Sequence, residues 1–167
     1  MTLAATPVDR STFAGIMSSF PTGVSIITTL DADGAPRGLT SNAICSVSAD
    51  PPMVLACVDR RSNTLPSLLA SGAWVVNFLV RGRGELSDLF ATKAVNKFEK
   101  VSWRPAGNGM PWLRADSIAH AECRTVQVIE AGDHVILLGQ VEGGSVPDSV
   151  GYPLVYFRRA YHCLPGG

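Results

Sequence analysis

Short apolar segments rich in Val, Ile and Thr recur along most of this chain, and turn residues separate many of them. Segments of this length and composition predict β-strands. Tight turns at Asp31-Ala-Asp-Gly34 and Glu130-Ala-Gly-Asp133 indicate that the strands beside them form antiparallel hairpins. The expected strands are Gly23–Leu30, Ala35–Thr40, Ala43–Val47, Met53–Val58, Ala73–Val80, Ser117–Ile129, His134–Val141 and a last strand from Leu154–Phe157 running on towards His162.

Short helices are expected between some of these strands. Spacing of i, i+3, i+4 and i+7 predicts an amphipathic helix through Phe13, Ile16, Met17 and Phe20. Asp9 or Ser11 is expected to cap its start, and Pro21 to end it. Two further helices are expected, one through Leu65, Leu68 and Leu69 that stops at Gly72, and one over Gly84–Thr92 with Leu86, Leu89 and Phe90 inward.

Helices that interrupt the strand order favour a closed or nearly closed antiparallel barrel over a sandwich of two sheets. The predicted fold class is therefore mainly β with short helices, as a Greek-key-like antiparallel barrel. A length of 167 residues fits one domain with a sizeable core. The chain has no internal repeat and no linker, so a single domain over residues 1–167 is expected, with residues 105–111 as a Gly/Pro-rich loop.

Composition narrows the range of partners. Hydrophobic residues make up 46% of the chain and charged residues only 17%, which is typical of a compact protein. Fourteen basic and fourteen acidic residues give a formal net charge of zero, without a basic run, and this argues against a nucleic-acid partner. A surface with so few charges favours self-association.

Several features predict a cytoplasmic protein without a membrane partner. The segment Met1–Asp9 does not read as a signal peptide, and the longest apolar runs, such as Ala73–Val80, are far shorter than the ~20 residues of a membrane helix. The four cysteines are widely spaced in mostly apolar surroundings: Cys45, Cys57, Cys123 and Cys163. They are expected to be reduced and mostly buried.

Three common kinds of site are not predicted. Gly82-Arg-Gly84 lacks the third glycine of a dinucleotide-binding fingerprint, so a nicotinamide cofactor has to bind without a Rossmann loop. His and Cys residues near positions 120–123 and 162–163 lack zinc spacing, so no metal is expected. No Gly-x-Ser-x-Gly sequence indicates a nucleophilic hydrolase.

Two polar clusters are candidates for binding a cofactor. Thr40-Ser-Asn-Ala43 comes off a strand, and its hydroxyl and amide groups suit the polar edge of an isoalloxazine ring, although such residues are also ordinary in turns. Arg60-Arg-Ser-Asn-Thr64 places two cations before the expected start of a helix. That combination suits an anion, although a capped surface helix with solvated arginines would look the same.

Gly132-Asp-His134 places a histidine beside a carboxylate at the start of a strand. A lone histidine is more often structural than functional. Here a tight turn would present it towards the mouth of the barrel, where ligands bind, so His134 is a candidate for ligand contact.

Taken together, these motifs resemble the short-chain flavin reductase family, the small reductase components of two-component flavin monooxygenases. The resemblance spans nearly the whole chain. The matching segments are Phe20-Pro-Thr-Gly-Val-Ser-Ile-Ile-Thr-Thr29, Gly38-Leu-Thr-Ser-Asn42, Ser46-Val-Ser-Ala-Asp-Pro-Pro52, Ser62-Asn-Thr64, Val76-Asn-Phe78, Lys97-Phe98, Gly132-Asp-His134 and Pro153-Leu-Val-Tyr156.

The resemblance implies a flavin-binding split β-barrel that works as a homodimer. It also implies that hydride passes from NADH or NADPH to FAD or FMN, and that reduced flavin leaves to serve a separate monooxygenase. FAD is favoured over FMN, and NADH over NADPH. No catalytic residue is predicted, because hydride transfer needs positioning rather than a protein nucleophile.

The resemblance also assigns site residues by position. Asp133 and His134 are expected to bind NADH. The residues expected to bind flavin are Thr40, Ser41, Asn42, Ala43, Ser46, Cys57, Arg61, Ser62, Asn63, Thr64, Lys97 and Phe98.

Two other functions remain open at this point. One is a reductase of another acceptor, such as an enzyme-bound cobalamin or a ferric complex, with tightly bound flavin. The other is a non-catalytic split-barrel protein that binds flavin or haem. The Gly132-Asp-His134 turn favours nicotinamide use and so argues against the non-catalytic protein.

Overall fold

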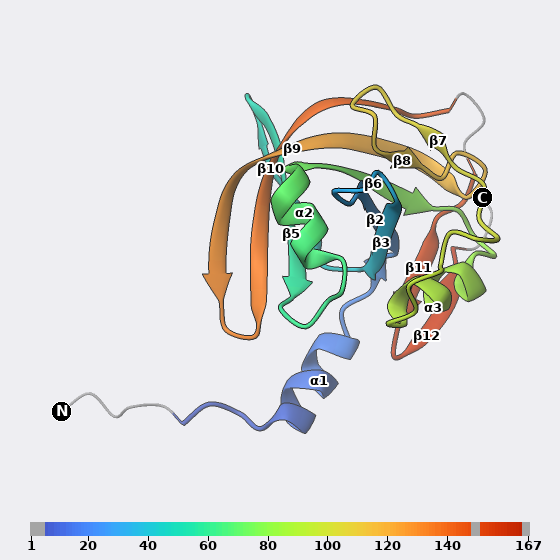
Figure 1. Ribbon diagram of the computed structural model, residues 1–167. Coiled ribbons are helices and arrows are strands. Elements are labelled where there is room, and N and C mark those ends of the chain that lie inside the picture. Colours follow the sequence, from blue (N-terminus) through green and yellow to red (C-terminus); the bar gives the residue numbers. More distant parts are fainter. Residues whose placement is uncertain (1–5, 148–150, 165–167) are drawn as a thin grey trace.

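The computed structural model describes residues 6–147 and 151–164, and its described part is mainly β-structure, as predicted (Figure 1). The two ends of the expected domain 1–167 fall outside the described residues. Within the described residues no helix is long and apolar enough to cross a membrane. No group of three or more His, Cys, Asp or Glu side chains there could hold a metal ion.

The main sheet contains seven strands, all antiparallel to their neighbours, in the order β3-β2-β6-β9-β10-β5-β4. They are β2 (Ser25–Leu30), β3 (Pro36–Ser41), β4 (Ile44–Ala49), β5 (Pro52–Asp59), β6 (Ala73–Leu79), β9 (Ser117–Ala131) and β10 (His134–Ser145). The prediction of an antiparallel, mainly β fold is confirmed.

The two edge strands of this sheet, β3 and β4, are consecutive in the chain. Only Asn42 and Ala43 separate them, so the seven strands must curl until the edges approach (Figure 1). No β-ladder joins β3 to β4 within the described residues, so hydrogen bonds do not close the sheet into a barrel. The β3–β4 split, as we call this opening between the edges, is where the candidate site lies.

A smaller three-stranded sheet has the order β1-β11-β12, with β1 (Thr22–Gly23), β11 (Leu154–Phe157) and β12 (Ala160–Cys163). The last predicted strand was wrong in one respect, because it is two strands joined by a turn. Arg158 and Arg159 reverse the chain there with φ angles of 48° and 63°. A further short pair, β7 (Arg104–Pro105) and β8 (Pro111–Trp112), lies within and beside the predicted 105–111 loop.

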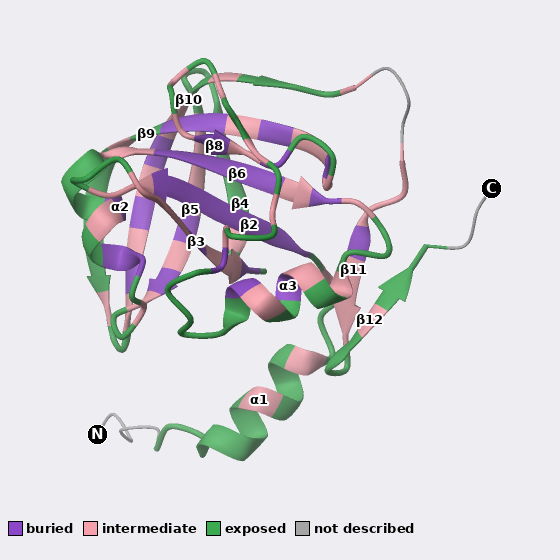
Figure 2. Cartoon of the chain, turned by 45° about the vertical axis from the view of Figure 1, so that its right-hand side comes forward, coloured by how far each residue is buried: buried purple, intermediate pink, exposed green. Residues whose placement is uncertain are grey.

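Helix α1 (Arg10–Ser18) begins as predicted, because the Asp9 carboxylate accepts a hydrogen bond of 2.8 Å from the backbone N–H of Thr12. It ends before Pro21, with Ser19 as its C-cap. No residue of α1 is buried, and Figures 1 and 2 show the helix beside the curved sheet with its surface uncovered. Its predicted apolar face is therefore exposed.

Helices α2 (Leu65–Ser71) and α3 (Gly84–Ala91) pack on the two hydrophobic clusters of the core. The first cluster includes the fully buried Trp74 and Leu68 of α2. The second is built around Phe90, with Leu86 and Leu89 packed against it, so the predicted inward face of this helix is confirmed. The second cluster packs α3 close to β3, where the Phe90 ring lies against Gly38, and so places the C-terminal end of α3 at the β3–β4 split.

The cysteines differ from the prediction that most are buried. All four thiols are free, but only Cys123 is buried, Cys57 is half-buried, and Cys45 and Cys163 are exposed. Burial, followed by the nearby Glu122 and Glu142 carboxylates, raises the pKa of Cys123 to about 12, so this thiol stays protonated. Apolar flanking residues gave the wrong expectation for Cys45 because β4 is an edge strand.

Candidate functional site

A cavity of about 380 Å³ opens at the β3–β4 split, which is within the size range of small-molecule sites. Its walls come from the β3–β4 crossing, the end of β5 with the turn that follows, the end of α3 with its following loop, and the start of β10. The lining residues are Leu39, Thr40, Ser41, Asn42, Ala43, Cys57, Asp59, Arg61, Ser62, Asn63, Phe90, Ala91, Thr92, Lys93, Lys97 and His134.

The β3–β4 crossing supplies short polar side chains to one wall. The Thr40 hydroxyl donates a 2.5 Å hydrogen bond to the Ser87 carbonyl, so its oxygen can only accept a further bond from a ligand. The Ser41 hydroxyl accepts from the backbone N–H of Ala43 at 3.1 Å and holds the crossing in shape. Asn42 is exposed and its amide donates to the Thr22 hydroxyl at 3.3 Å, so its side-chain carbonyl is accessible to a ligand. Both backbone polar groups of Ala43 are bonded within the protein, to the Ser41 hydroxyl and to the backbone N–H of Cys57.

The turn after β5 carries a charged pair at the edge of the cavity. Asp59 accepts hydrogen bonds from the backbone N–H of Arg61 at 2.8 Å and from its guanidinium Nη2 at 2.8 Å. These bonds hold the pKa of Asp59 far below its usual range, so the carboxylate stays ionised at neutral pH. The Arg61 side chain is 70% exposed, so its remaining N–H groups can reach a ligand anion.

The three residues that directly precede α2 have different structural roles: they are Ser62, Asn63 and Thr64. The Ser62 hydroxyl accepts from the backbone N–H of Thr64 at 3.2 Å, and the Asn63 amide donates to the Lys93 carbonyl at 3.1 Å. The Asn63 bond ties this turn to the loop after α3. Thr64 is buried and donates to the Gly38 carbonyl at 3.0 Å, so its side chain supports β3 and does not line the cavity.

Lys97 lines the cavity, and Phe98 lies behind its wall. The buried Lys97 ammonium donates to the carbonyls of Phe90 at 2.8 Å and Gly38 at 3.1 Å, and burial lowers its pKa. Two of its three protons are therefore used inside the protein. Phe98 packs edge-to-face on Phe90 with ring centroids 5.0 Å apart and is not among the lining residues.

His134 enters the cavity from the start of β10. Its Nδ1 lies 2.7 Å from the Asp133 carboxylate, and that contact lowers the pKa of Asp133. Asp133 itself is exposed and outside the lining, so it orients the ring of His134 from behind. Nearby, burial raises the pKa of Cys57, which lines the cavity as a neutral thiol.

The structure thus brings most of the predicted site residues to one cavity: Thr40, Ser41, Asn42, Ala43, Cys57, Arg61, Ser62, Asn63, Lys97 and His134. Thr64, Phe98 and Asp133 stand one layer behind it. Ser46 does not belong to this group, because it is exposed on β4 beyond the part of the strand that reaches the cavity.

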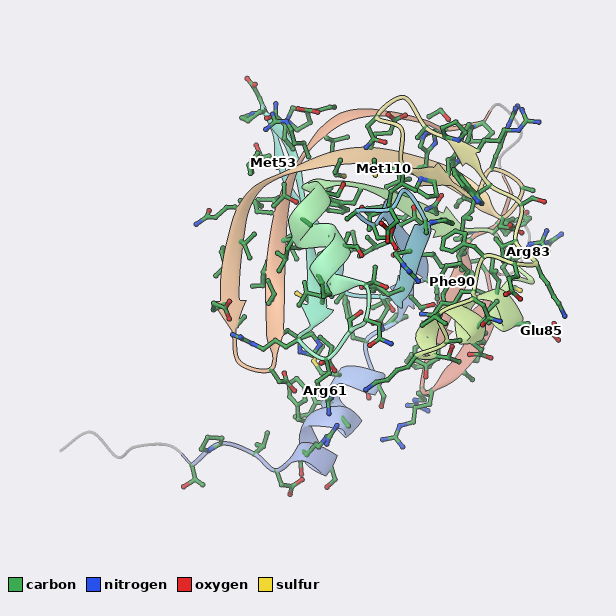
Figure 3. All side chains as sticks on the ribbon, in the orientation of Figure 1. Met53, Arg61, Arg83, Glu85, Phe90 and Met110 are labelled. Carbon is green, nitrogen blue, oxygen red and sulfur yellow. The ribbon has the colours of Figure 1, made fainter. Side chains whose placement is uncertain are left out.

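Sequence reasoning missed several lining residues, namely Leu39, Asp59, Phe90, Ala91, Thr92 and Lys93. Asp59 directly precedes a cluster that the sequence analysis had singled out, so proximity in sequence was a usable signal. The sequence carried no such signal for the residues at the end of α3, because they reach the cavity only through the packing of α3 on β3. Figure 3 shows Phe90 on α3 and Arg61 just past the end of β5, on separate elements that border the site.

Comparison with known proteins identifies the family of the chain that contains this cavity. The family described as flavin reductase like domain matches residues 17–165. The chain belongs to this family. The resemblance in the sequence motifs is therefore confirmed over nearly the whole chain.

Individual relatives of this flavin reductase-like protein are similar over most of their length. A flavin reductase (NADH) of Kitasatospora aureofaciens is 44% identical over 98% of this chain and 86% of its own. The reductase subunit HsaB of a flavin-dependent monooxygenase of Mycobacterium tuberculosis is 34% identical over 92% of this chain and 82% of its own. The solved structure of the NADH:FAD oxidoreductase SgcE6 of Streptomyces globisporus, in complex with NAD and FAD fragments, has a TM-score of 0.85 at 31% identity, covering 95% of this chain and 96% of that one.

Proposed function

We propose that this protein is an NAD(P)H:flavin oxidoreductase that reduces FAD or FMN and releases the reduced flavin to a separate monooxygenase. The observation that carries the proposal is the cavity at the β3–β4 split. Short hydroxyl and amide groups of Thr40–Ala43 line one wall, and the Arg61 guanidinium stands with Ser62 and Asn63 at another. This donor set fits a planar polar ring that carries a phosphate.

The residues of the chain act by holding and orienting the reactants. Thr40, Ser41 and Asn42 contact the polar edge of the ring, while Arg61, Ser62 and Asn63 hold the phosphate end. His134, oriented by Asp133, contacts the nicotinamide. A bound flavin would supply the hydride acceptor, and these residues would contribute by orienting it and the nicotinamide, so no catalytic acid or nucleophile is assigned.

The names of the relatives support NADH as donor and FAD as acceptor for this chain. One relative is a flavin reductase (NADH), and the solved structure is of an NADH:FAD oxidoreductase. A monooxygenase partner is supported by the HsaB reductase subunit. Lys93, near the cavity mouth with Arg61, adds a second cation for the phosphate that both FAD and FMN carry.

The test is NADH oxidation followed at 340 nm with purified protein, with and without FAD or FMN. We expect turnover that requires added flavin and saturates with it, and a lower Michaelis constant for FAD than for FMN. Turnover without added flavin, together with flavin retained on dilution, would favour a tightly bound flavin and another acceptor. No NADH oxidation with either flavin by folded protein would favour a non-catalytic binding protein.

His134→Ala is expected to raise the Michaelis constant for NADH about 10-fold while flavin affinity changes little, because a lost hydrogen bond from a polar side chain costs about 1–1.5 kcal/mol. Steady-state kinetics against NADH and a flavin titration by fluorescence measure the two effects. Weakened flavin binding with an unchanged NADH constant would overturn the assignment of His134.

We infer that the working form is a cytoplasmic homodimer. The four free thiols agree with a reducing compartment. The exposed fractions of Phe13, Ile16 and Met17 on α1 are 57%, 59% and 49%, and that of Phe20 is 63%, which leaves an apolar face that a second copy would cover.

The homodimer predicts that Phe13→Asp combined with Ile16→Asp shifts the protein to monomers. Two charges on the uncovered face of α1 would have to be buried in the interface, at a cost that the apolar contacts cannot offset. Sedimentation velocity at several concentrations measures the shift. Thr12→Asp, on the same helix but outside the apolar set, is the control and leaves the sedimentation coefficient unchanged. A wild-type protein that sediments as a monomer at all concentrations would contradict the homodimer.

A further inference from the structure

A second cavity of about 380 Å³ adjoins the first one. The two share Thr40, Asn42 and Ala91 as lining residues, so they meet at the β3–β4 crossing. The second cavity extends from there between α3 and the β11–β12 hairpin. The function proposed above assigns no ligand to it.

The far wall of this cavity is aromatic. Tyr156 of β11 and Tyr161 of β12 line it, with ring centroids 5.4 Å apart and planes at 57°. The Tyr161 hydroxyl donates to Asp88 Oδ1 at 2.6 Å and lies 2.9 Å from Ser87 Oγ, both of α3. Burial, followed by the bond to Asp88, raises the pKa of Tyr161, so the ring is fixed in its protonated form. A flat heterocycle can stack against such a wall.

The turn between β11 and β12 places a cation at the cavity. Arg159 lines it, is exposed, and forms no ion pair among the described residues. Two consecutive arginines in the left-handed region are costly, because turns of this kind favour Asn and Gly. The backbone N–H of Arg158 donates to the Ser18 carbonyl at 2.9 Å and anchors the turn. Strain of this kind is retained where the resulting side-chain position has a use.

We propose that this second cavity is a subsite for the adenosine diphosphate half of a dinucleotide. The base stacks on Tyr156 and Tyr161, the ribose hydroxyls donate to Asp88, and Arg159 contacts the diphosphate. This inference rests on the proposed function, because it treats the ligand as the remainder of a nucleotide whose reactive ring lies in the first cavity. Adenosine diphosphate occurs in both NADH and FAD, and the chemistry of the cavity is the same for either.

The position of the cavity favours NADH as the source. It opens at Thr40 and Asn42, which are assigned to the ring end of flavin, whereas Arg61 and Ser62 at the phosphate end do not line it. A nicotinamide stacked on the flavin ring would therefore extend its adenosine half into the second cavity. The adenosine half of FAD is attached at the phosphate end of the flavin, so it would instead extend away from the second cavity.

The test compares Arg159→Gln with Arg158→Gln. The two changes remove the same charge from neighbouring positions of one turn with similar backbone strain, but the Arg158 guanidinium lies 5.2 Å from the centre of the Phe157 ring and outside the cavity. We expect Arg159→Gln to weaken the binding of ADP, measured by calorimetry, at least 5-fold, and Arg158→Gln to leave it unchanged. Wild-type protein that binds no ADP, or an equal loss in both variants, would overturn the proposal.

Steady-state kinetics then show whether the adenosine diphosphate group that binds there belongs to NADH or to FAD. With NADH as source, Arg159→Gln raises the Michaelis constant for NADH at least 5-fold and leaves that for reduced nicotinamide mononucleotide unchanged. With FAD as source, the constant for FAD rises and that for FMN does not. A rise for the mononucleotides as well would show that Arg159 acts on the first cavity and would overturn the proposal. The ADP titration requires no turnover, so failure of the proposed function and failure of this subsite are distinguishable.

Discussion

Replacing Asn77 by leucine is expected to lower the free energy of unfolding by about 3–5 kcal/mol, because a buried hydrogen-bonding group left without its partner costs about 1–3 kcal/mol. Asn77 lies in β6 with no exposed surface. Its amide donates to the Ile26 carbonyl and the Thr28 hydroxyl, both at 3.0 Å, and its carbonyl accepts from the backbone N–H of Leu113 at 2.8 Å. Leucine is similar in volume but removes these bonds from the Ile26 carbonyl and the Leu113 N–H, whereas the Thr28 hydroxyl keeps its bond to the Pro111 carbonyl.

Urea unfolding at one fixed protein concentration measures the change, because self-association makes the apparent stability depend on concentration. Asn96→Leu is the matched control. Its amide donates to Glu99 on the exposed surface, so the expected change is within about 0.5 kcal/mol. Equal losses of unfolding free energy in the two variants would contradict the role assigned to Asn77. That role is to hold β2 and the segment after β8 against β6 through hydrogen bonds.

Asn77 also shows why some of the fold could not be predicted from the sequence. The nearly continuous apolar run around it correctly predicts a buried strand over Ala73–Val80, where the structure has β6 over Ala73–Leu79. An isolated polar residue inside an apolar strand, however, can face solvent or the core. Only the register of β6 with β2 and β9 decides this, and register is a long-range property.

The same limit applies to the chain termini. The spacing of Phe13, Ile16 and Met17 correctly predicts a helix, but periodicity does not say what covers its apolar face. At the other end, the residues from Leu154 to His162 were predicted as one strand because Arg158-Arg159 is not a recognised turn sequence. Local rules failed at that position because two arginines adopt a conformation that usually requires Asn or Gly.

Candidate site residues were predicted best where the chain itself brings them together. Thr40–Ala43 and Arg61–Asn63 are contiguous segments, and both line the cavity. Lys97 was predicted from the family pattern as a flavin contact, and the structure shows that two of its protons serve the Phe90 and Gly38 carbonyls. A sequence pattern records that a lysine is present, and only the tertiary structure shows which acceptors it meets.

Arg61→Ala is expected to weaken FMN binding about 10- to 100-fold, since a hydrogen bond to a charged group contributes about 1.5–3 kcal/mol and each 1.4 kcal/mol is tenfold in affinity. The change removes a cation from the phosphate end of the cavity. It also leaves the Asp59 carboxylate, now bonded to Arg61 Nη2 at 2.8 Å, as an uncompensated negative charge facing the phosphate. Riboflavin, which has no phosphate, should bind the variant as well as it binds the wild type. Quenching of flavin fluorescence measures all of these affinities.

Two further variants separate phosphate binding from a change in the shape of the cavity. Arg60→Ala is the matched control, because Arg60 donates to the Gly132 carbonyl at 3.0 Å and pairs with Glu130, and it does not line the cavity. The double variant Asp59→Asn with Arg61→Ala should recover part of the lost FMN affinity, since it removes the repelling carboxylate along with the cation. If riboflavin binding falls as far as FMN binding in Arg61→Ala, then Arg61 supports the wall of the ring site, and the phosphate end of the flavin lies elsewhere in the cavity.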